Sequence, residues 1–190
     1  MQSRTNSAKN AESGLAQKVN LAKAEHRTIH VMDFRPSDLP YSEFYRILIS
    51  SVAPRPIAWV STISAAGQLN LAPFSFFNAI CSKPPLLAFA PALRLRGKEE
   101  TVKGETKDTL RNVRETGEFV VNVVTYEVAE AMNLTSGEYD STVNEFELAK
   151  LTRRPSKMVK PPHVAESSVN FECKVYQILD FSSHPTVAAW

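Results

Sequence analysis

The chain has 190 residues, of which 43% are hydrophobic, and its 22 basic and 20 acidic residues give a net charge of +2. This length suits one domain with a sizeable core, and the near balance of charge lacks the basic excess typical of a nucleic-acid-binding protein. Two cysteines are too few for a disulfide framework or a tetrahedral zinc site, the six glycines form no dinucleotide-binding or Walker loop, and no apolar run is long enough to span a bilayer.

The first 31 residues differ in composition from the rest of the chain. They contain five basic residues, two glutamates and no aromatic residue. This composition predicts a basic, disordered extension over 1–31, followed by one domain over 32–190. Apolar residues between Leu15 and Ala22 have helical spacing, so a short amphipathic helix for organelle targeting or for packing on a partner subunit is the alternative. The two glutamates count against targeting, and the expected location is the cytoplasm.

Strand patterns dominate the chain from Leu48 to Phe89. Before a turn at Ala65–Gln68, successive side chains can point alternately to the two faces of a sheet, and this pattern predicts a hairpin. Two prolines then precede a short apolar run. Similar patterns recur later in the chain. The predicted strands are 57–63, 69–80, 86–90, 119–124 and 168–178.

Two helices are predicted among the later strands. One begins at Thr106 or Asp108 and runs to about Thr116, where Gly117 supplies a stop, and the other covers 126–134. Two short helices among five or six strands do not match the regular alternation of a parallel α/β sheet. We therefore expect a mainly β protein, an antiparallel barrel with inserted helices, with ligands bound at its mouth or against a neighbouring subunit.

Several kinds of active site have no support in the sequence. None of the four histidines lies within metal-ligand spacing of a second strong ligand, so no metal site is predicted. Among the four, His184 is the one most suited to a functional role, because it stands at the end of a predicted strand. No Gly-x-Ser-x-Gly elbow occurs, so a nucleophilic hydrolase lacks a positive signal. The basic cluster from Arg153 to Lys160 lacks interleaved aromatic residues, so no nucleic-acid partner is expected.

Polar side chains recur inside the strands between residues 55 and 78. Hydroxyl and amide groups are unusual in strands that serve only for packing, and they suit a planar heterocycle that carries carbonyls and ring nitrogens. The alternative is that the hydroxyls are satisfied within the sheet and that the aromatic residues are core. The polar candidates are Ser61, Thr62, Ser75 and Asn78, and the apolar ones are Trp59, Phe76 and Phe77.

An anion site is predicted at the start of the helix that follows Thr106. Lys107, Asp108 and Thr109 stand at this N-terminus, where free backbone N–H groups and the helix dipole both favour a phosphate. Arg55 would supply a second positive charge.

Four segments in this order resemble the flavin reductase-like, FMN-binding split-barrel family. They are Arg55–Thr62, Asn70–Asn78, Lys107–Asn112 and Glu118–Asn122, and the likeness covers roughly residues 40 to 180. The resemblance implies a six-stranded antiparallel Greek-key split barrel and a homodimer with FMN at its interface. It also implies reduction of flavin by NADH or NADPH, and some relatives serve as reductase partners of monooxygenases.

The same resemblance implies the cofactor-binding residues. The isoalloxazine and ribityl chain would be lined by Trp59, Val60, Ser61 and Thr62, with Ser75, Phe76, Phe77 and Asn78 opposite. The phosphate would be bound by Lys107, Asp108 and Thr109, and by Arg55 as a weaker match. Relatives continue beyond the position of Phe181 into a further strand, where only 182–190 remain here, so a barrel lacking its last strand is expected. Some relatives have a histidine at the nicotinamide side, for which His184 is the candidate counterpart.

Three functions compete at this point. The first is an NAD(P)H-dependent FMN reductase, in which FMN accepts hydride and no acid or base residue is required. The second is another split-barrel activity, such as oxidation of pyridoxine phosphate or reduction of a metal complex, because a fold does not fix the substrate. The third is a non-catalytic FMN-binding or interaction protein.

Overall fold

The computed structural model describes residues 33–91, 93–94, 105–181 and 184–189. The chain divides into two compact units, Met1–Leu48 and Ile49–Trp190. The extension predicted over 1–31 lies outside the described residues. Within the ranges that are described, no helix combines the length and the apolar character needed to cross a membrane.

The helix α1 (Tyr41–Ser51) begins in the first unit, after the short 3-10 helix η1 (Pro36–Asp38). Its first turn is closed by the Glu43 and Phe44 N–H groups, which donate to the Pro40 carbonyl at 3.0 and 3.1 Å. One turn apart, Tyr41 and Tyr45 stack with ring centroids 6.1 Å apart. The sequence pattern had assigned residues from Leu48 onward to strands, which is wrong up to Ser51, because an apolar run of this length does not distinguish a helix end from a strand.

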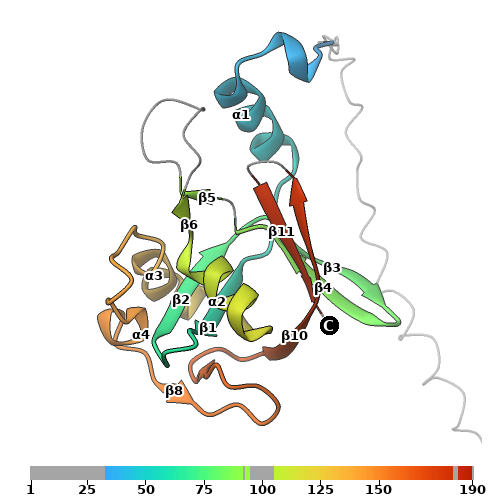
Figure 1. Ribbon diagram of the computed structural model, residues 1–190. Helices are drawn as coiled ribbons and strands as arrows, with labels where there is room; N and C mark the ends of the chain where they lie inside the picture. Colours follow the sequence, from blue (N-terminus) through green and yellow to red (C-terminus); the bar gives the residue numbers. More distant parts are fainter. Residues whose placement is uncertain (1–32, 92, 95–104, 182–183, 190) are drawn as a thin grey trace, which may run out of the picture. The chain divides into compact units, whose positions relative to one another are not determined.

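Seven antiparallel strands form the main sheet, in the order β2-β1-β7-β10-β11-β4-β3 (Figure 1). In the described residues the order starts at β2 and ends at β3, so the sheet is not closed, and its seven strands do not confirm the predicted count of six. The Greek-key path stays a prediction. The strands are β1 (Ala58–Ile63), β2 (Leu69–Phe74), β3 (Phe77–Ser82), β4 (Pro85–Phe89), β7 (Glu118–Val123), β10 (Asn170–Phe181) and β11 (His184–Ala189).

The strand β10 joins the two halves of this sheet. Residues 170–174 pair with β7, whereas residues 175–181 pair with β11. The strand β11 also pairs with β4, so that Val187 stands opposite Ile178 on one side and opposite Phe89 on the other. The expectation that the last strand is missing is therefore wrong, since a six-residue segment between two partners forms that strand despite its proline and its small residues.

The segment 69–80, predicted as one strand, is divided at Ser75 and Phe76. The strand β2 ends at Phe74 and β3 begins at Phe77, and the two lie at opposite ends of the strand order. At the bend, the Phe76 carbonyl accepts a hydrogen bond from the Ala90 N–H at 2.9 Å. The bend therefore depends on a residue beyond β4, which no local pattern predicts. The predicted hairpin is confirmed, because β1 and β2 pair in register.

The two predicted helices are confirmed, but α1 and one short helix were missed. The helix α2 (Asp108–Thr116) ends at Gly117, whose φ of 70° is left-handed, and α3 (Ala129–Leu134) follows the 3-10 helix η2 (Tyr126–Val128). The short α4 (Glu145–Leu148) was not predicted; the Asn144 side chain caps it by accepting from the Phe146 N–H. Two small two-stranded sheets complete the described elements, β5 (Leu93–Arg94) with β6 (Glu105–Thr106) and β8 (Arg153–Arg154) with β9 (His163–Val164).

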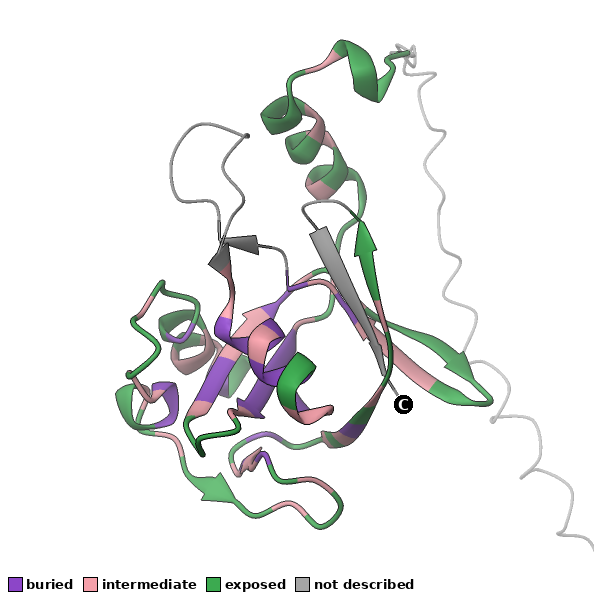
Figure 2. Cartoon of the chain, in the orientation of Figure 1, coloured by how far each residue is buried: buried purple, intermediate pink, exposed green. Residues whose placement is uncertain are grey.

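Two apolar clusters lie on opposite faces of β1. On one face Phe89 packs between Phe74 and Phe119, with centroid distances of 5.2 Å to each, and α2 covers them with Leu110 and other residues. On the other face Trp59 packs with residues of the α3 and α4 region. Figure 2 shows buried residues concentrated in β1, β7 and α2, with β3 exposed. The core thus fixes α2 and β2, the two elements that form the site described next.

Candidate functional site

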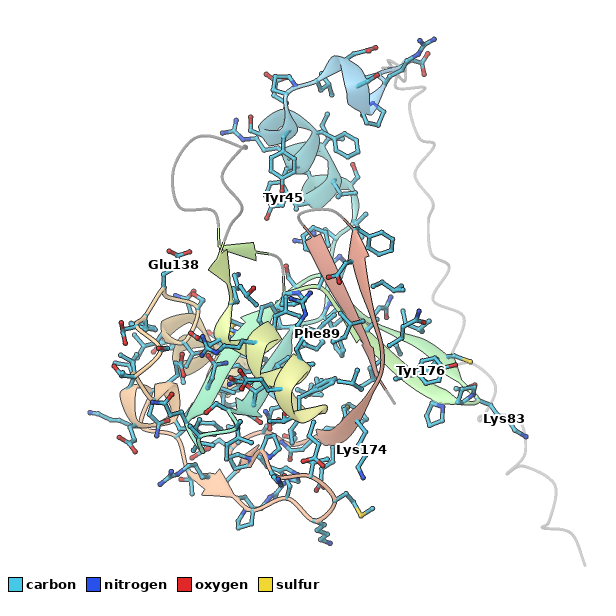
Figure 3. All side chains as sticks on the ribbon, in the orientation of Figure 1. Tyr45, Lys83, Phe89, Glu138, Lys174 and Tyr176 are labelled. Atoms are coloured by element: carbon cyan, nitrogen blue, oxygen red, sulfur yellow. The ribbon has the colours of Figure 1, made fainter. Side chains whose placement is uncertain are left out.

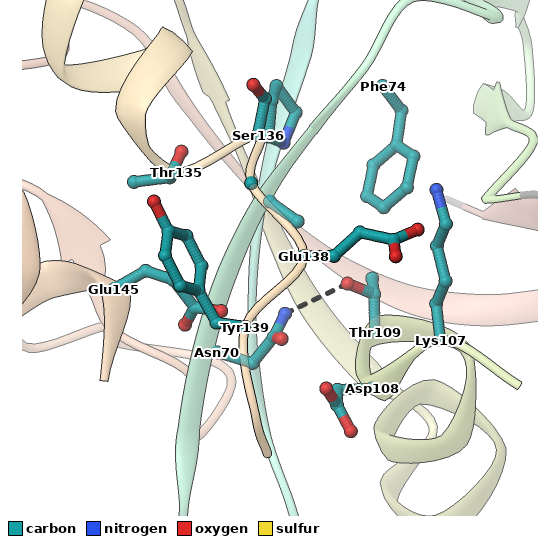
Figure 4. Close-up of a pocket in the computed structure, with 13 residues that line it drawn as sticks. Asn70, Phe74, Lys107, Asp108, Thr109, Thr135, Ser136, Glu138, Tyr139 and Glu145 are labelled. Carbon is teal, nitrogen blue, oxygen red and sulfur yellow. Dashed lines mark hydrogen bonds between the residues drawn. The ribbon is translucent and has the colours of Figure 1, made fainter. Parts of the chain in front are cut away.

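A pocket lies between β2, the N-terminus of α2 and the loop 135–139 that follows α3 (Figure 4). The lining residues are Asn70, Ala72, Pro73, Phe74, Lys107, Asp108, Thr109, Thr135, Ser136, Gly137, Glu138, Tyr139 and Glu145. Three of them, Lys107, Asp108 and Thr109, are the residues predicted for an anion site. The structure therefore brings this predicted group to a pocket wall.

Lys107 and the start of α2 give the pocket its cationic side. Lys107 is the N-cap of α2, and no side chain caps the helix at this position. Because the first N–H groups of a helix have no intrahelical acceptor, this end favours an anion. The Lys107 ammonium lies 5.6 Å from the centre of the Phe74 ring. The neighbouring Asp108 carboxylate accepts from Arg111 at 2.5 Å, which partly offsets its negative charge.

Asn70 and Thr109 form the buried polar floor of the pocket. The Asn70 amide Nδ2 donates to the Thr109 hydroxyl at 2.9 Å, and the two residues are only 7% and 1% exposed. Asn70 is the first residue of the second sequence motif, but the sequence analysis did not assign it to the site. Its contact with a helix 39 residues further along the chain was not visible from spacing.

The loop 135–139 forms a well-anchored wall opposite the helix. Thr135 accepts from the Trp59 indole N–H at 2.8 Å and donates to the Met132 carbonyl at 2.8 Å. The Tyr139 hydroxyl donates to the Leu134 carbonyl at 2.8 Å. A Cβ at Gly137 would stand 2.7 Å from the Tyr139 ring, so a larger residue here would displace this ring. Three hydrogen bonds thus hold the wall in place.

Two further carboxylates line the pocket. Glu145 is 7% exposed and accepts from the Leu71 N–H at 3.1 Å, which satisfies a backbone group on the free edge of β2. Glu138 is exposed, and Figure 4 shows it reaching into the pocket from the loop, on the side of Thr109 and Lys107. The sequence analysis did not predict either residue. The pocket is therefore of mixed charge, with its hydrogen-bond donors on the side of β2 and α2.

The four β1 residues predicted to contact the flavin are buried. Trp59, Val60, Ser61 and Thr62 are each 0% exposed. The Ser61 hydroxyl donates to the Pro162 carbonyl at 2.6 Å, and the Thr62 hydroxyl accepts from the Asn112 amide at 3.0 Å. Both hydroxyls thus have partners within the protein, as the alternative interpretation expected. A flavin contact for these residues stays a prediction.

The remaining predicted residues do not line this pocket. The Arg55 guanidinium donates to the carbonyls of Ile49 and Val52 at 2.8 and 2.6 Å, beside the end of α1, and lies 5.6 Å from the Phe76 ring centre. Asn78 accepts from the Ala79 N–H at 2.9 Å. Ser75 and Phe77 flank Phe76 at the bend before β3, and His184 begins β11, opposite Phe181.

The donor set of the pocket fits a phosphate group. A lysine ammonium, the buried hydroxyl of Thr109 and a helix N-terminus are all hydrogen-bond donors of the kind that bind phosphate oxygens. A metal ion has less support: in the described part of the chain, no three His, Cys, Asp or Glu side chains gather closely enough to hold one.

Comparison with known proteins gives matches over most of the chain. The profile of a family described as flavin reductase like domain matches residues 50–189. A relative from Aquifex aeolicus, described only as an uncharacterized protein, is 46% identical over 146 residues, which cover 77% of this chain and 71% of the relative.

Two solved structures share both sequence and fold with the chain. Nitrilotriacetate monooxygenase component B from Bacillus cereus is 30% identical with a TM-score of 0.76, over 85% of this chain and 79% of that one. The 2-nitrobenzoate 2-nitroreductase of Pseudomonas fluorescens is 31% identical with a TM-score of 0.72, over 83% and 73% of the two chains.

Proposed function

The chain belongs to the flavin reductase-like family, and from that premise we propose that it is an FMN-dependent oxidoreductase that uses NADH or NADPH to reduce FMN. The observation that carries the choice of FMN is the pocket at the start of α2, whose lining includes Lys107 and Thr109, groups that could bind a phosphate. A flavin that ends in a phosphomonoester matches this site, whereas riboflavin has no anion to place there.

The residues of the pocket fit FMN at its phosphate end. Lys107 would supply positive charge, and Thr109 with the first N–H groups of α2 would donate hydrogen bonds to phosphate oxygens. When bound, FMN supplies a ring that accepts hydride from a reduced nicotinamide. The protein's task is then to hold and orient the flavin and to leave one ring face open to the nicotinamide.

We assign the ring end of the flavin to the segments that the family resemblance identified. These are Trp59–Thr62 on β1 and Ser75–Asn78 at the start of β3, with Arg55 beside Phe76. Phe76 is 40% exposed, and the Arg55 guanidinium lies 5.6 Å from its ring centre. The buried Trp59 would act here through Thr135, which it holds at the pocket wall.

We also propose that the protein is a homodimer and that a second copy covers β3 and β10. These strands expose large apolar side chains, with Ile80, Tyr176 and Phe181 each about 60% exposed. Figure 3 labels Lys83, at the tip of the β3–β4 hairpin, and Tyr176, on β10; β11 lies between β10 and β4 in the strand order. Because large apolar side chains exposed on two strands of one sheet are costly in water, a partner surface is expected.

The test is anaerobic reduction followed by absorbance. Purified protein with FMN is mixed with NADH or NADPH, and we expect the flavin absorption band to bleach faster than in protein-free controls. FMN that binds without faster bleaching would favour the non-catalytic binding protein. Faster oxidation of pyridoxine phosphate than of NAD(P)H would favour the oxidase alternative.

The names of the two solved relatives suggest the acceptors to add next. One is a monooxygenase component and the other a nitroreductase. A flavin reductase should support NADH oxidation with free FMN alone, and its product should be consumed by a separate monooxygenase. A nitroreductase should require 2-nitrobenzoate or a similar nitroaromatic for sustained NADH oxidation under anaerobic conditions.

A further inference from the structure

The hydrogen bond on the pocket floor has a defined direction. Asn70 donates through its amide Nδ2 to the Thr109 hydroxyl oxygen at 2.9 Å, which Figure 4 marks with a dashed line. Both side chains line the pocket, although only 7% of Asn70 and 1% of Thr109 is exposed. A threonine hydroxyl has one proton and can accept two hydrogen bonds. With the Asn70 N–H group on its oxygen, Thr109 must direct its own proton elsewhere.

That proton has no acceptor within the described ranges of the chain. The hydrogen bonds of Thr109 in those ranges include the one from Asn70 and none in which its hydroxyl donates. A buried donor without an acceptor costs free energy comparable to a lost hydrogen bond. Because Thr109 lines the pocket, an acceptor placed there by a ligand would satisfy its proton.

We propose that Asn70 is a positioning residue that holds the Thr109 hydroxyl as a hydrogen-bond donor toward the pocket. This inference rests on the proposed function, since the acceptor would be a phosphate oxygen of FMN. The oxygens of an ionised phosphate accept hydrogen bonds but have no proton to donate. A hydroxyl that is fixed as a donor therefore favours a phosphate over a ligand group that must itself donate a hydrogen bond. Asn70 then contributes to FMN affinity through Thr109 and not by touching the flavin.

A second bridge of the same kind supplies a matched control. The Asn112 amide donates to the Thr62 hydroxyl at 3.0 Å, and these residues are 2% and 0% exposed. This bridge also joins α2 to the sheet, but neither residue is among those that line the pocket. Substitution of Asn112 therefore tests whether loosening the helix is sufficient to weaken FMN binding.

The experiment is a double-mutant cycle on full-length protein, with FMN and riboflavin as ligands. Asn70→Leu, Thr109→Val, the double variant and Asn112→Leu are titrated by flavin fluorescence, and urea unfolding reports the stability of each. We expect Asn70→Leu to weaken FMN binding about tenfold, the lower end of the range for loss of one hydrogen bond to a charged group, and to change riboflavin binding less than about twofold. In the Thr109→Val background, Asn70→Leu should cause no further loss.

Three results would overturn the inference while leaving the proposed function intact. One is a loss of FMN affinity in Asn70→Leu that adds fully to the loss in Thr109→Val, because Asn70 would then act independently of Thr109. Another is an equal loss for riboflavin. The third is that Asn112→Leu changes the ratio of FMN affinity to riboflavin affinity as much as Asn70→Leu does. Wild-type protein that binds neither flavin would instead overturn the proposed function and this inference with it.

Discussion

Lys107 carries the positive charge that is assigned to the FMN phosphate. We predict that Lys107→Ala weakens FMN binding about tenfold to a hundredfold, the range for loss of a hydrogen bond between charged groups. Reduction of FMN at saturating flavin should slow far less, because Lys107 is assigned to the phosphate and not to the ring. Fluorescence titration and stopped-flow reduction measure the two effects.

Lys160→Ala is the charge-matched control for Lys107→Ala. Lys160 is exposed in the loop between β8 and β9 and is not among the residues that line the pocket. Its substitution should leave FMN affinity within about twofold, since exposed charges at a distance are screened by salt. If Lys107→Ala reduced affinity and hydride transfer equally, the phosphate assignment would be wrong.

The stabilisation that the Glu172 carboxylate gives the fold depends on pH. Burial would raise the pKa of its carboxyl, but hydrogen bonds from the Lys157 and Met158 N–H groups and from His163 outweigh it, and the pKa lies below its ordinary value of 4.5. A depressed pKa in the folded state stabilises the protein above pH 4.5, and this stabilisation is lost as pH falls through the lowered value.

We predict that Glu172→Gln lowers the free energy of unfolding at pH 7 by about 1–2 kcal/mol, because a weaker, uncharged acceptor replaces the carboxylate. The difference from wild type should shrink as the pH falls below 4.5. Urea unfolding at pH 7 and in steps below pH 5 measures both effects. Glu130→Gln, on the exposed side of α3, is the control, and a difference between wild type and Glu172→Gln that is constant with pH would contradict the prediction.

At the level of single residues, the sequence predicted one wall of the pocket and missed the other. Lys107, Asp108 and Thr109 were identifiable because a helix start can be recognised locally. The loop 135–139 and Glu145 reach the pocket only because the chain returns to β2 after α3, and that return depends on distant contacts such as Trp59 with Thr135.

The element that places the anion site is α2, and Gly117 ends it. Gly117 has a φ of 70°, and its N–H donates to the Val113 carbonyl. No atom lies within 4 Å of the position of an added Cβ, so the cost of a side chain comes from backbone conformation alone. We predict that Gly117→Ala lowers stability by about 1 kcal/mol, with a smaller loss in Gly117→Asn. Thermal or urea unfolding measures this, and equal stability of all three proteins would contradict it.

Among the elements, those defined by neighbouring residues were predicted well. The β1–β2 hairpin and α2 were predicted because a turn, a cap and a terminal glycine lie within a few residues of each other. The division of 69–80 into two strands and the formation of β11 were not, because each depends on pairing with a strand distant in the sequence. Local composition therefore did not predict a strand where β11 forms.

At the scale of the whole molecule, the apolar surface of β3 and β10 predicts a dimer. We expect wild-type protein to have the mass of two chains by size-exclusion chromatography with light scattering. Ile80→Lys should shift it toward one chain, because Ile80 is 61% exposed on β3 and a buried lysine in the interface is costly. Circular dichroism would check that the fold is retained.

The control for this prediction is Tyr126→Lys. Tyr126 is 93% exposed and begins the 3-10 helix η2, outside β3 and β10. It should leave the mass unchanged. A wild-type monomer, or equal dissociation by both substitutions, would contradict the dimer and its assigned surface.

The central claim is that this chain binds FMN through a phosphate site at the start of α2. The most direct measurement is an equilibrium titration of the wild-type protein with FMN and, in parallel, with riboflavin, followed by flavin fluorescence. We predict saturable binding of both, with FMN bound at least about tenfold more tightly, as expected when a charged phosphate gains hydrogen bonds. Equal affinity for the two flavins, or binding of neither, would contradict the claim.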